Sequence, residues 1–206
     1  MRRHKLEIED SLEIEKVLAK AEWGILGINN SEFPALVPLN FVAHKNCVYF
    51  HGALAGEKFE LAKKHPQVSF LVVDAYAQLP SYFFDAKAAC PATQLYKSVL
   101  MKGRLRMVYN DEEKASALQL LMEKLQPEGG HEPIRADSEL YKNRLKGVAV
   151  IAMDLEERSA KFKLGQDQTE SWRENVCRQL AKRGCPVDHQ TLSEIARLAA
   201  EAKSVR

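Results

Sequence analysis

Short runs of apolar residues, separated by turn-forming residues, follow one another through the first quarter of the chain. WGILGIN, FPALVPLNFVA and CVYFHG are such runs, and residues 29–32 and the sequence HKN separate them. Asn, Ser and Gly favour turns, whereas Val, Ile, Tyr and Phe favour strands. The pattern predicts three antiparallel strands joined by hairpins.

Three further segments have strand character. QVSFLVVDAY is rich in β-branched and aromatic residues, and YKSVLMKGRLRMVYN is a longer run with Gly103 as a predicted bulge or bend. GVAVIAMDLEE, continued by SAKFKLGQ, completes the set of six strands. Lys102, Arg104 and Arg106 alternate along the second of these runs, which places them on one strand face that we expect to be solvated.

Helical signals surround the strands. Asp10 and Asn110 each precede a helical pattern, with a Glu three residues later as in a capping box, and the pattern after Asn110 has an apolar face. A short helix is predicted for residues 56–64, because the proline that follows His65 disfavours helical backbone there. Two polar helices, about residues 171–183 and 188–203, close the chain.

The order of these elements decides the fold class. Strands follow one another by hairpins and no βαβ alternation occurs, which favours a small antiparallel barrel with peripheral helices over a doubly wound sheet.

Composition narrows the range of functions. The 206 residues are 46% hydrophobic, which is enough for a packed core, and the formal net charge of +2 does not suggest nucleic-acid binding. The four cysteines form no CxxC pair, so we expect buried or free thiols and no metal site. No apolar run approaches the roughly 20 residues of a membrane span, and no signal peptide is evident, so we expect no membrane association and a cytoplasmic location.

The stretch HGALAGEKFE, residues 51–60, has the composition of a phosphate-binding turn. It lacks the GxxxxGK[ST] sequence of a triphosphate loop, and GxGxxG is absent as well. A strand end, a glycine-rich turn and a helix N-terminus beside Lys58 suit a single phosphate. An ordinary turn with a solvated Lys58 is the alternative.

Several motifs in succession resemble one known family. After Arg2 and Arg3, the chain carries in order VPLNFV, VYFHGALAGEKFELAKKHPQVSFLVV and YKSVLMKGRLRMV. This succession resembles the FMN-binding split-barrel superfamily of pyridoxamine 5′-phosphate oxidases, especially its nitroimidazole-resistance, NimA-like branch. FKLGQDQTESWRENVCRQLAKRG resembles the tail of other flavin-binding split barrels, including PaiB-like regulators, with Gly165 where that tail has Ser and Asp167 where it has Asn. Glu57 stands where pyridoxamine phosphate oxidases have Arg.

The resemblance implies a six-stranded antiparallel split β-barrel over residues 1–165, with a C-terminal helical extension at 166–206. It also implies a homodimer with FMN at the subunit interface. Lys58 would contact the flavin phosphate. The resemblance implies that His51, Gly52, Ala53 and Gly56 surround the phosphate and ribityl chain. It implies that the isoalloxazine edge is followed by Val37, Pro38, Leu39 and Asn40. Ser98 would occupy a polar position on a later strand.

Two residues have alternative interpretations. His51 is the candidate catalytic residue, because a histidine near a flavin can bind a substrate anion or relay a proton; it can equally be a structural hydrogen-bond donor. Asn40 can hydrogen-bond the flavin ring or the backbone at a hairpin.

Two functions remain open. The first is an FMN-dependent oxidoreductase that passes electrons from NAD(P)H to a small acceptor such as a nitroaromatic. The second is a non-catalytic flavin or haem binding module, or a redox-responsive regulator of PaiB-like type. A C-terminal pair of Arg and His that would bind a substrate phosphate is not evident after Gly165, which disfavours pyridoxamine phosphate oxidase activity itself.

Overall fold

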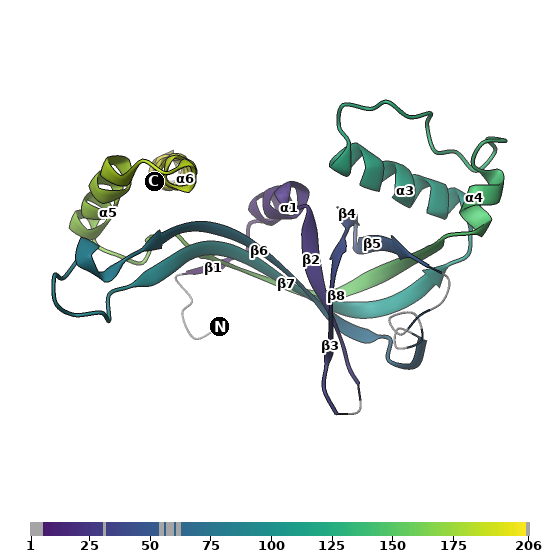
Figure 1. Ribbon diagram of the computed structural model, residues 1–206, viewed down its shortest axis with the longest axis horizontal. Coiled ribbons are helices and arrows are strands. Elements are labelled where there is room, and N and C mark those ends of the chain that lie inside the picture. The colour runs from purple at the N-terminus through teal and green to yellow at the C-terminus, as the bar shows by residue number, and fades with distance from the viewer. Residues whose placement is uncertain (1–5, 31, 54–55, 57–59, 61–62, 205–206) are drawn as a thin grey trace. The chain divides into compact units, whose positions relative to one another are not determined.

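The computed structural model describes residues 6–30, 32–53, 56, 60 and 63–204 (Figure 1). The chain divides into two compact units. The first contains Met1–Glu9, Val73–Ser98 and Ala160–Arg206, and the second contains Asp10–Val72 and Val99–Ser159. These units are not consecutive stretches of the chain, so they do not test the predicted domain boundary at residue 165, which stays a prediction.

The strands form one antiparallel sheet, and the predicted class, a mainly β split barrel with peripheral helices, is confirmed. In the described part of the chain the sheet has eight strands in place of the predicted six, because the short strand β1 joins it and the single run predicted at residues 33–43 forms two strands, β3 and β4. The order is β3-β2-β6-β7-β8-β5-β4, with β1 paired to β8. The strands are β1 (Glu7–Ile8), β2 (Trp23–Ile28), β3 (Ala35–Asn40), β4 (Val42–His44), β5 (Cys47–Gly52), β6 (Gln67–Leu79), β7 (Thr93–Val108) and β8 (Ala149–Lys163).

The sheet curls within the second unit. β3 and β4 stand at opposite ends of the hydrogen-bonded order, yet only Phe41 separates them in the chain. β3 also contacts β5, the neighbour of β4. The two ends of the sheet therefore approach each other without a hydrogen-bonded ladder among the described residues, as a split barrel requires.

Four of the five predicted helices are present, as α1, α3, α5 and α6, and side-chain caps explain where α1 and α3 begin. Asp10 accepts a hydrogen bond from the backbone N–H of Leu12 at 2.8 Å, and Asn110 accepts one from Glu113 at 2.9 Å. The helices are α1 (Ser11–Lys20), α3 (Asp111–Leu125), α4 (Lys142–Lys146), α5 (Glu170–Arg183) and α6 (Pro186–Ser204), with a 3₁₀ turn, η2, at Ser81–Phe83. Most of the short helix predicted for residues 56–64 lies outside the described residues.

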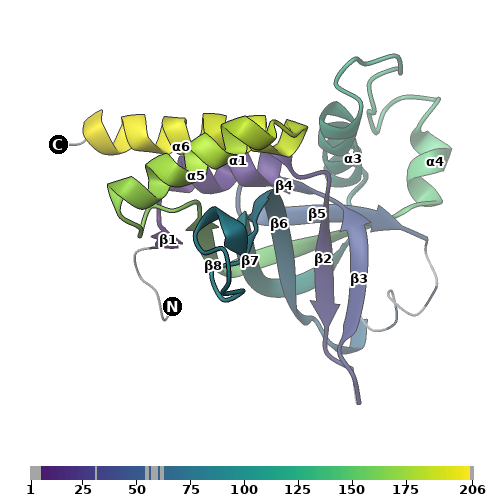
Figure 2. The ribbon, with the colours of Figure 1, turned by 60° about the vertical axis from the view of Figure 1, so that its left-hand side comes forward.

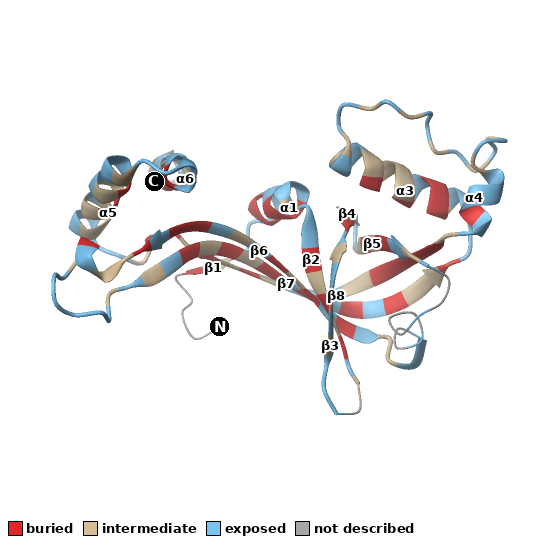
Figure 3. Ribbon diagram, viewed as in Figure 1, coloured by how far each residue is buried: buried red, intermediate tan, exposed pale blue. Residues whose placement is uncertain are grey.

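Strand alternation divides the sheet of the second unit into two faces. Leu26, Ile28, Phe50 and Phe70 are almost fully buried and form the interior (Figure 3). On the outer face, α3 packs against β5 and β8, where the apolar contacts come from Val108, Ala117, Leu118, Tyr49, Val148, Val150 and Ala152. The outer face of β2 and β3 carries exposed side chains.

In the first unit, α5 and α6 lie side by side (Figure 2), and they share an apolar core with parts of β6 and β7 and with Leu164, which follows β8. Thr191 of α6 accepts a hydrogen bond from the backbone N–H of Ala77 at 2.9 Å, and Arg183 donates to the carbonyl of Gln78 at 2.9 Å. The pairing of β6 with β2 runs from Val68 to Leu71. The helices thus bind backbone groups of β6 beyond the part that β2 covers, which is one way in which proteins protect a sheet edge.

Candidate functional site

β3 carries four of the predicted flavin-binding residues at an end of the sheet. Val37 and Leu39 are half-buried, whereas Pro38 and Asn40 are exposed. An edge strand leaves one row of backbone N–H and C=O groups outside the ladder, and a proline is tolerated there. The amide of Asn40 donates to the carbonyl of Glu22 at 2.8 Å, so this side chain has the backbone contact that was its alternative role.

β5 and the turn after it carry the next group of candidates. His51 is exposed and lies opposite Val150, on the sheet face that α3 covers. Gly52 is half-buried and Ala53 is exposed. Gly56 has φ +124°, a conformation that L side chains rarely adopt, and a Cβ atom there would have no neighbour within 4 Å. The backbone conformation of Gly56 therefore favours glycine, although there is room for a side chain.

Some predicted site residues fall elsewhere. Lys58, Arg2 and Arg3 lie outside the described residues. Ser98 is half-buried on β7 and belongs to the first unit. The structure therefore brings together the candidates on β3 and β5, whose strands contact each other in the second unit.

Gly165, where related tails have Ser, has a local structural reason to be glycine. Its φ is +85°, and a Cβ atom would lie 2.5 Å from the ring of Trp172. Trp172 in turn stacks on Phe84, with ring centroids 5.4 Å apart. The indole occupies the space that a serine side chain at residue 165 would need.

The basic residues on the outer face of β7 form a ladder of ion pairs with β8. Lys102 pairs with Glu157 at 2.9 Å, Arg104 with Glu156 at 2.7 Å, and Arg106 with Asp154 at 3.0 Å. All three basic side chains are at least a third exposed, as the predicted solvated face requires, but that prediction omitted their carboxylate partners.

Arg106 is also the centre of a network that joins α3 to the sheet. Its guanidinium donates to both carboxylate oxygens of Glu113, at 2.7 and 3.1 Å, and Tyr49 donates to Glu113 at 3.0 Å. At the other end, the Cys47 thiol donates to Asp154 at 3.1 Å. Sequence analysis missed this network because its members are far apart in the chain.

The network fixes the protonation of its members. The hydrogen bond from Arg106 lowers the pKa of Glu113, while burial raises the pKa of Tyr49 well above its usual range. Burial also raises the pKa of the Cys47 thiol. Cys47 therefore stays protonated as a hydrogen-bond donor and lacks the thiolate that a nucleophile needs.

We expect Glu113→Gln to lower the free energy of unfolding by about 1 kcal/mol at pH 7, because the pair with Arg106 is partly exposed. The folded-state pKa of Glu113 is depressed, so its contribution is present above the unfolded value of about 4.3 and is lost as the pH falls through the folded value. Urea unfolding between pH 7 and pH 3 measures this. Glu112→Gln, at an exposed neighbour, is the control, and a wild-type to Glu113→Gln difference that does not change with pH would contradict the assignment.

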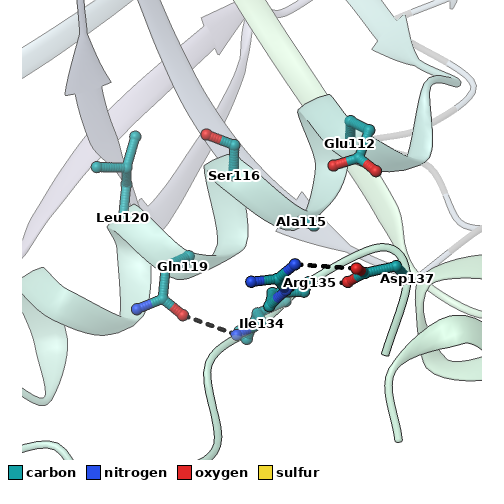
Figure 4. Close-up of a pocket in the computed structure, with 8 residues that line it drawn as sticks. All are labelled: Glu112, Ala115, Ser116, Gln119, Leu120, Ile134, Arg135 and Asp137. Atoms are coloured by element: carbon teal, nitrogen blue, oxygen red, sulfur yellow. Dashed lines mark hydrogen bonds and ion pairs between the residues drawn. The ribbon is translucent and has the colours of Figure 1, made fainter. Parts of the chain in front are cut away.

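A separate cavity of about 300 Å³ lies between α3 and residues 134–137 (Figure 4). Gln119 accepts a hydrogen bond from the backbone N–H of Ile134 at 2.9 Å, and Arg135 pairs with Asp137 at 2.9 Å. Its lining, Glu112, Ala115, Ser116, Gln119, Leu120, Ile134, Arg135 and Asp137, contains none of the candidate flavin residues.

Further observations concern metal ligands, cysteines and the lengths of the helices. Over the residues it describes, no group of three or more His, Cys, Asp and Glu side chains could hold a metal ion. All four cysteines are free, as predicted. None of the described helices is both long enough and apolar enough to span a membrane.

Comparison with known proteins identifies the family. Residues 10–162 match the pyridoxamine 5′-phosphate oxidase family, and the chain belongs to it. This confirms the predicted superfamily. A search of the curated proteins finds no match.

Solved structures of similar fold include three with TM-scores of 0.61 to 0.66. One is a proposed 5-nitroimidazole antibiotic resistance protein from Bacteroides thetaiotaomicron (TM-score 0.61, 21% identity, 76% of this chain and 86% of that chain). The second is the flavocytochrome Anf3 from Azotobacter vinelandii (TM-score 0.65, 23% identity, 79% of this chain and 72% of that chain). The third is an FAD and haem binding protein from Mycobacterium smegmatis (TM-score 0.66, 14% identity, 82% of this chain and 78% of that chain). At these identities the likeness establishes the fold.

Proposed function

We propose that this protein is a flavoprotein that binds FMN along β3 and at the turn after β5. The observation that carries the proposal is that the family motifs VPLN and HGA fall on two strands that contact each other, beside a glycine turn with φ +124°. Open backbone at a glycine turn can approach a phosphate closely, and an edge strand offers free backbone groups to a flat ring. The described residues thus fit a flavin.

Each candidate has a role in this proposal. The backbone of Gly52, Ala53 and Gly56 surrounds the phosphate and ribityl chain, and Lys58 supplies the positive charge that the phosphate needs. Val37, Pro38, Leu39 and Asn40 line the isoalloxazine edge. When bound, the flavin supplies electron transfer from a reduced nicotinamide to a small acceptor such as a nitroaromatic. The protein's own part is to bind and orient the ring and to exclude water.

The solved structures of similar fold support this class of function. Two of them are described as a flavocytochrome and as an FAD and haem binding protein, and a third as a proposed nitroimidazole resistance protein. We extend the flavin to this chain, with NAD(P)H and a small acceptor as its substrates, and place the protein in the cytoplasm without nucleic-acid or membrane partners.

The active form in this proposal is a homodimer. Trp23 is 56% exposed and Leu36 is 69% exposed, and strand register places both on the outer face of β2 and β3 with Pro38. A sheet face of this kind is covered in the assembled state of many proteins. Light scattering at micromolar concentration should give twice the chain mass of 23.3 kDa, and the mass of a single chain would contradict the dimer.

A non-catalytic flavin or haem binding module, or a redox-responsive regulator, is the second candidate. The haem named for the Mycobacterium smegmatis structure of similar fold favours including it. Adding NAD(P)H to the flavin-loaded protein separates the two functions. Bleaching of the flavin absorbance that is reversed by an acceptor supports the oxidoreductase, whereas a flavin that stays oxidised supports the module.

We expect Lys58→Ala to raise the dissociation constant of FMN by about tenfold to a hundredfold, because a charge-assisted bond to a phosphate contributes roughly 1.5–3 kcal/mol. Quenching of flavin fluorescence measures the constant. Lys102→Ala is the matched control, since Lys102 is half-exposed and paired with Glu157, and it should change the constant by less than about twofold. Equal constants for the two variants would refute the assigned phosphate site.

A further inference from the structure

Lys124, in the last turn of α3, is a half-buried lysine whose ammonium group has a partner for each of its three N–H donors. It donates hydrogen bonds to the carbonyl oxygens of Leu18 at 2.9 Å and Phe41 at 3.0 Å. The same nitrogen lies 3.7 Å from the centroid of the Phe41 ring. Two carbonyl oxygens and one aromatic face match the three N–H donors of an ammonium group. Burial lowers the pKa of Lys124 to about 8, so the group still carries its charge at neutral pH.

These contacts join three elements at one corner of the second unit. Leu18 belongs to the last turn of α1, whose carbonyl groups have no partner within the helix and attract positive charge. Phe41 is the single residue between β3 and β4; it is fully buried and packs edge-on against Phe70, with centroids 5.0 Å apart. Lys124 therefore fixes both the backbone and the ring of the residue that follows Asn40.

Asn40 is tied to the same corner by its own side chain, through the hydrogen bond to Glu22. Glu22 lies two residues beyond the end of α1, and Trp23 pairs with Asn40 across β2 and β3. The carboxyl end of β3 is thus held from two sides, by Asn40 toward the α1–β2 connection and by Lys124 through Phe41.

We propose that Lys124 is a positioning residue that holds β3 in the place and orientation that the flavin requires. This inference rests on the proposed flavin site for its functional part. Its structural part, that Lys124 fixes the junction of β3 and β4, is independent of any ligand. Lys124 would not touch the flavin itself; it acts through Phe41 and Asn40.

Lys114 provides a matched control on the same helix. It is also buried and also donates to two backbone carbonyl groups, those of Leu145 at 3.0 Å and Val148 at 3.4 Å. Those residues belong to α4 and to the segment between α4 and β8. Loss of Lys114 should therefore destabilise the fold without disturbing β3.

The test compares Lys124→Met, Lys124→Arg and Lys114→Met by two measurements, with Lys124→Gln as a milder variant should Lys124→Met not fold. The first measurement is hydrogen exchange of the flavin-free protein. Lys124→Met should exchange at least about tenfold faster over residues 37–44, a difference that corresponds to about 1.4 kcal/mol of local opening, and Lys114→Met should change residues 145–150 instead. The second is FMN affinity by fluorescence quenching, where Lys124→Met should weaken binding about tenfold, and Lys124→Arg should stay within about threefold of the wild type.

Each outcome is decisive. Exchange over residues 37–44 that is unchanged in Lys124→Met, or in Lys124→Gln if that variant is used, overturns the structural part. Faster exchange there with unchanged FMN affinity overturns the functional part, as does equal weakening of FMN binding by Lys114→Met. If the wild-type protein binds no flavin, the proposed function fails by itself, and the exchange measurement still decides whether Lys124 fixes β3.

Discussion

Gly103→Ala is expected to lower the free energy of unfolding by about 3 kcal/mol or more, the upper part of the range for overpacking a well-packed interior. Gly103 is buried in β7, and a Cβ atom there would lie 2.1 Å from the carbonyl oxygen of Asp154 on β8. The obstacle is backbone of a neighbouring strand and not the end of a flexible side chain, so relief requires the two strands to separate. Urea or thermal unfolding of the purified variant measures the loss.

Gly27→Ala is the matched control, because Gly27 also lies inside a strand of the same unit but has room. Its nearest neighbours to a Cβ atom, Leu36 and Ser69, are both 3.6 Å away. Its effect should stay within about 1 kcal/mol, the range of strand propensity. Similar losses for the two variants would show that close approach of β7 to β8 is not the reason for glycine at residue 103.

Asp188→Ala is expected to lower the free energy of unfolding by about 3 kcal/mol, since the carboxylate is fully buried and its loss leaves Arg183 without its charge partner. Asp188 is 0% exposed and accepts hydrogen bonds from Arg183 at 2.9 Å and from the backbone N–H of Cys185 at 3.0 Å. The carboxylate lies in the first turn of α6, where negative charge is favoured. Thermal unfolding of the variant at pH 7 measures the effect.

Asp137→Ala removes a carboxylate of similar geometry from the surface. Asp137 and Arg135 form a two-point pair at 2.9 and 3.0 Å, but their side chains are 65% and 68% exposed. Exposed pairs contribute little, so this loss should be below about 1 kcal/mol. If Asp188→Ala is no more destabilising than Asp137→Ala, burial of the Asp188 carboxylate does not strengthen its ion pair with Arg183.

Local sequence patterns predicted most of the fold because local physics dominates in these elements. The caps Asp10 and Asn110 and the strand alternation of VYF and VSFLVV each follow from a few neighbouring residues. The two-residue strand β1 was not predicted, since so short a segment carries no periodicity, and β4 was predicted only as the end of the strand that contains β3. Gly103 was predicted as a bulge or bend, whereas β7 runs through it without interruption; its need for glycine comes from β8, some 50 residues away in sequence.

The candidate site was predicted from a resemblance to a family, and only part of it could be predicted from the sequence. The motifs VPLN and HGA place the candidates on β3 and β5, but no single pattern relates these strands to Lys124 or to the network around Arg106. The contacts of Lys124 span 83 and 106 positions of the chain, those of the network around Arg106 span between 7 and 107, and the partners are backbone carbonyl groups or side chains of common types. Contacts of this kind follow from the packing of α3 on the sheet, which the sequence pattern alone does not specify.

The absorbance spectrum of the purified protein shows directly whether it carries a flavin. We expect a yellow protein with flavin maxima at about 370 and about 450 nm, which after denaturation releases FMN in a ratio of about one per chain. Loading the protein with excess FMN, followed by gel filtration, controls for loss of cofactor during purification. A protein that remains colourless after this treatment, while folded and of the expected mass, would contradict the proposed flavin site.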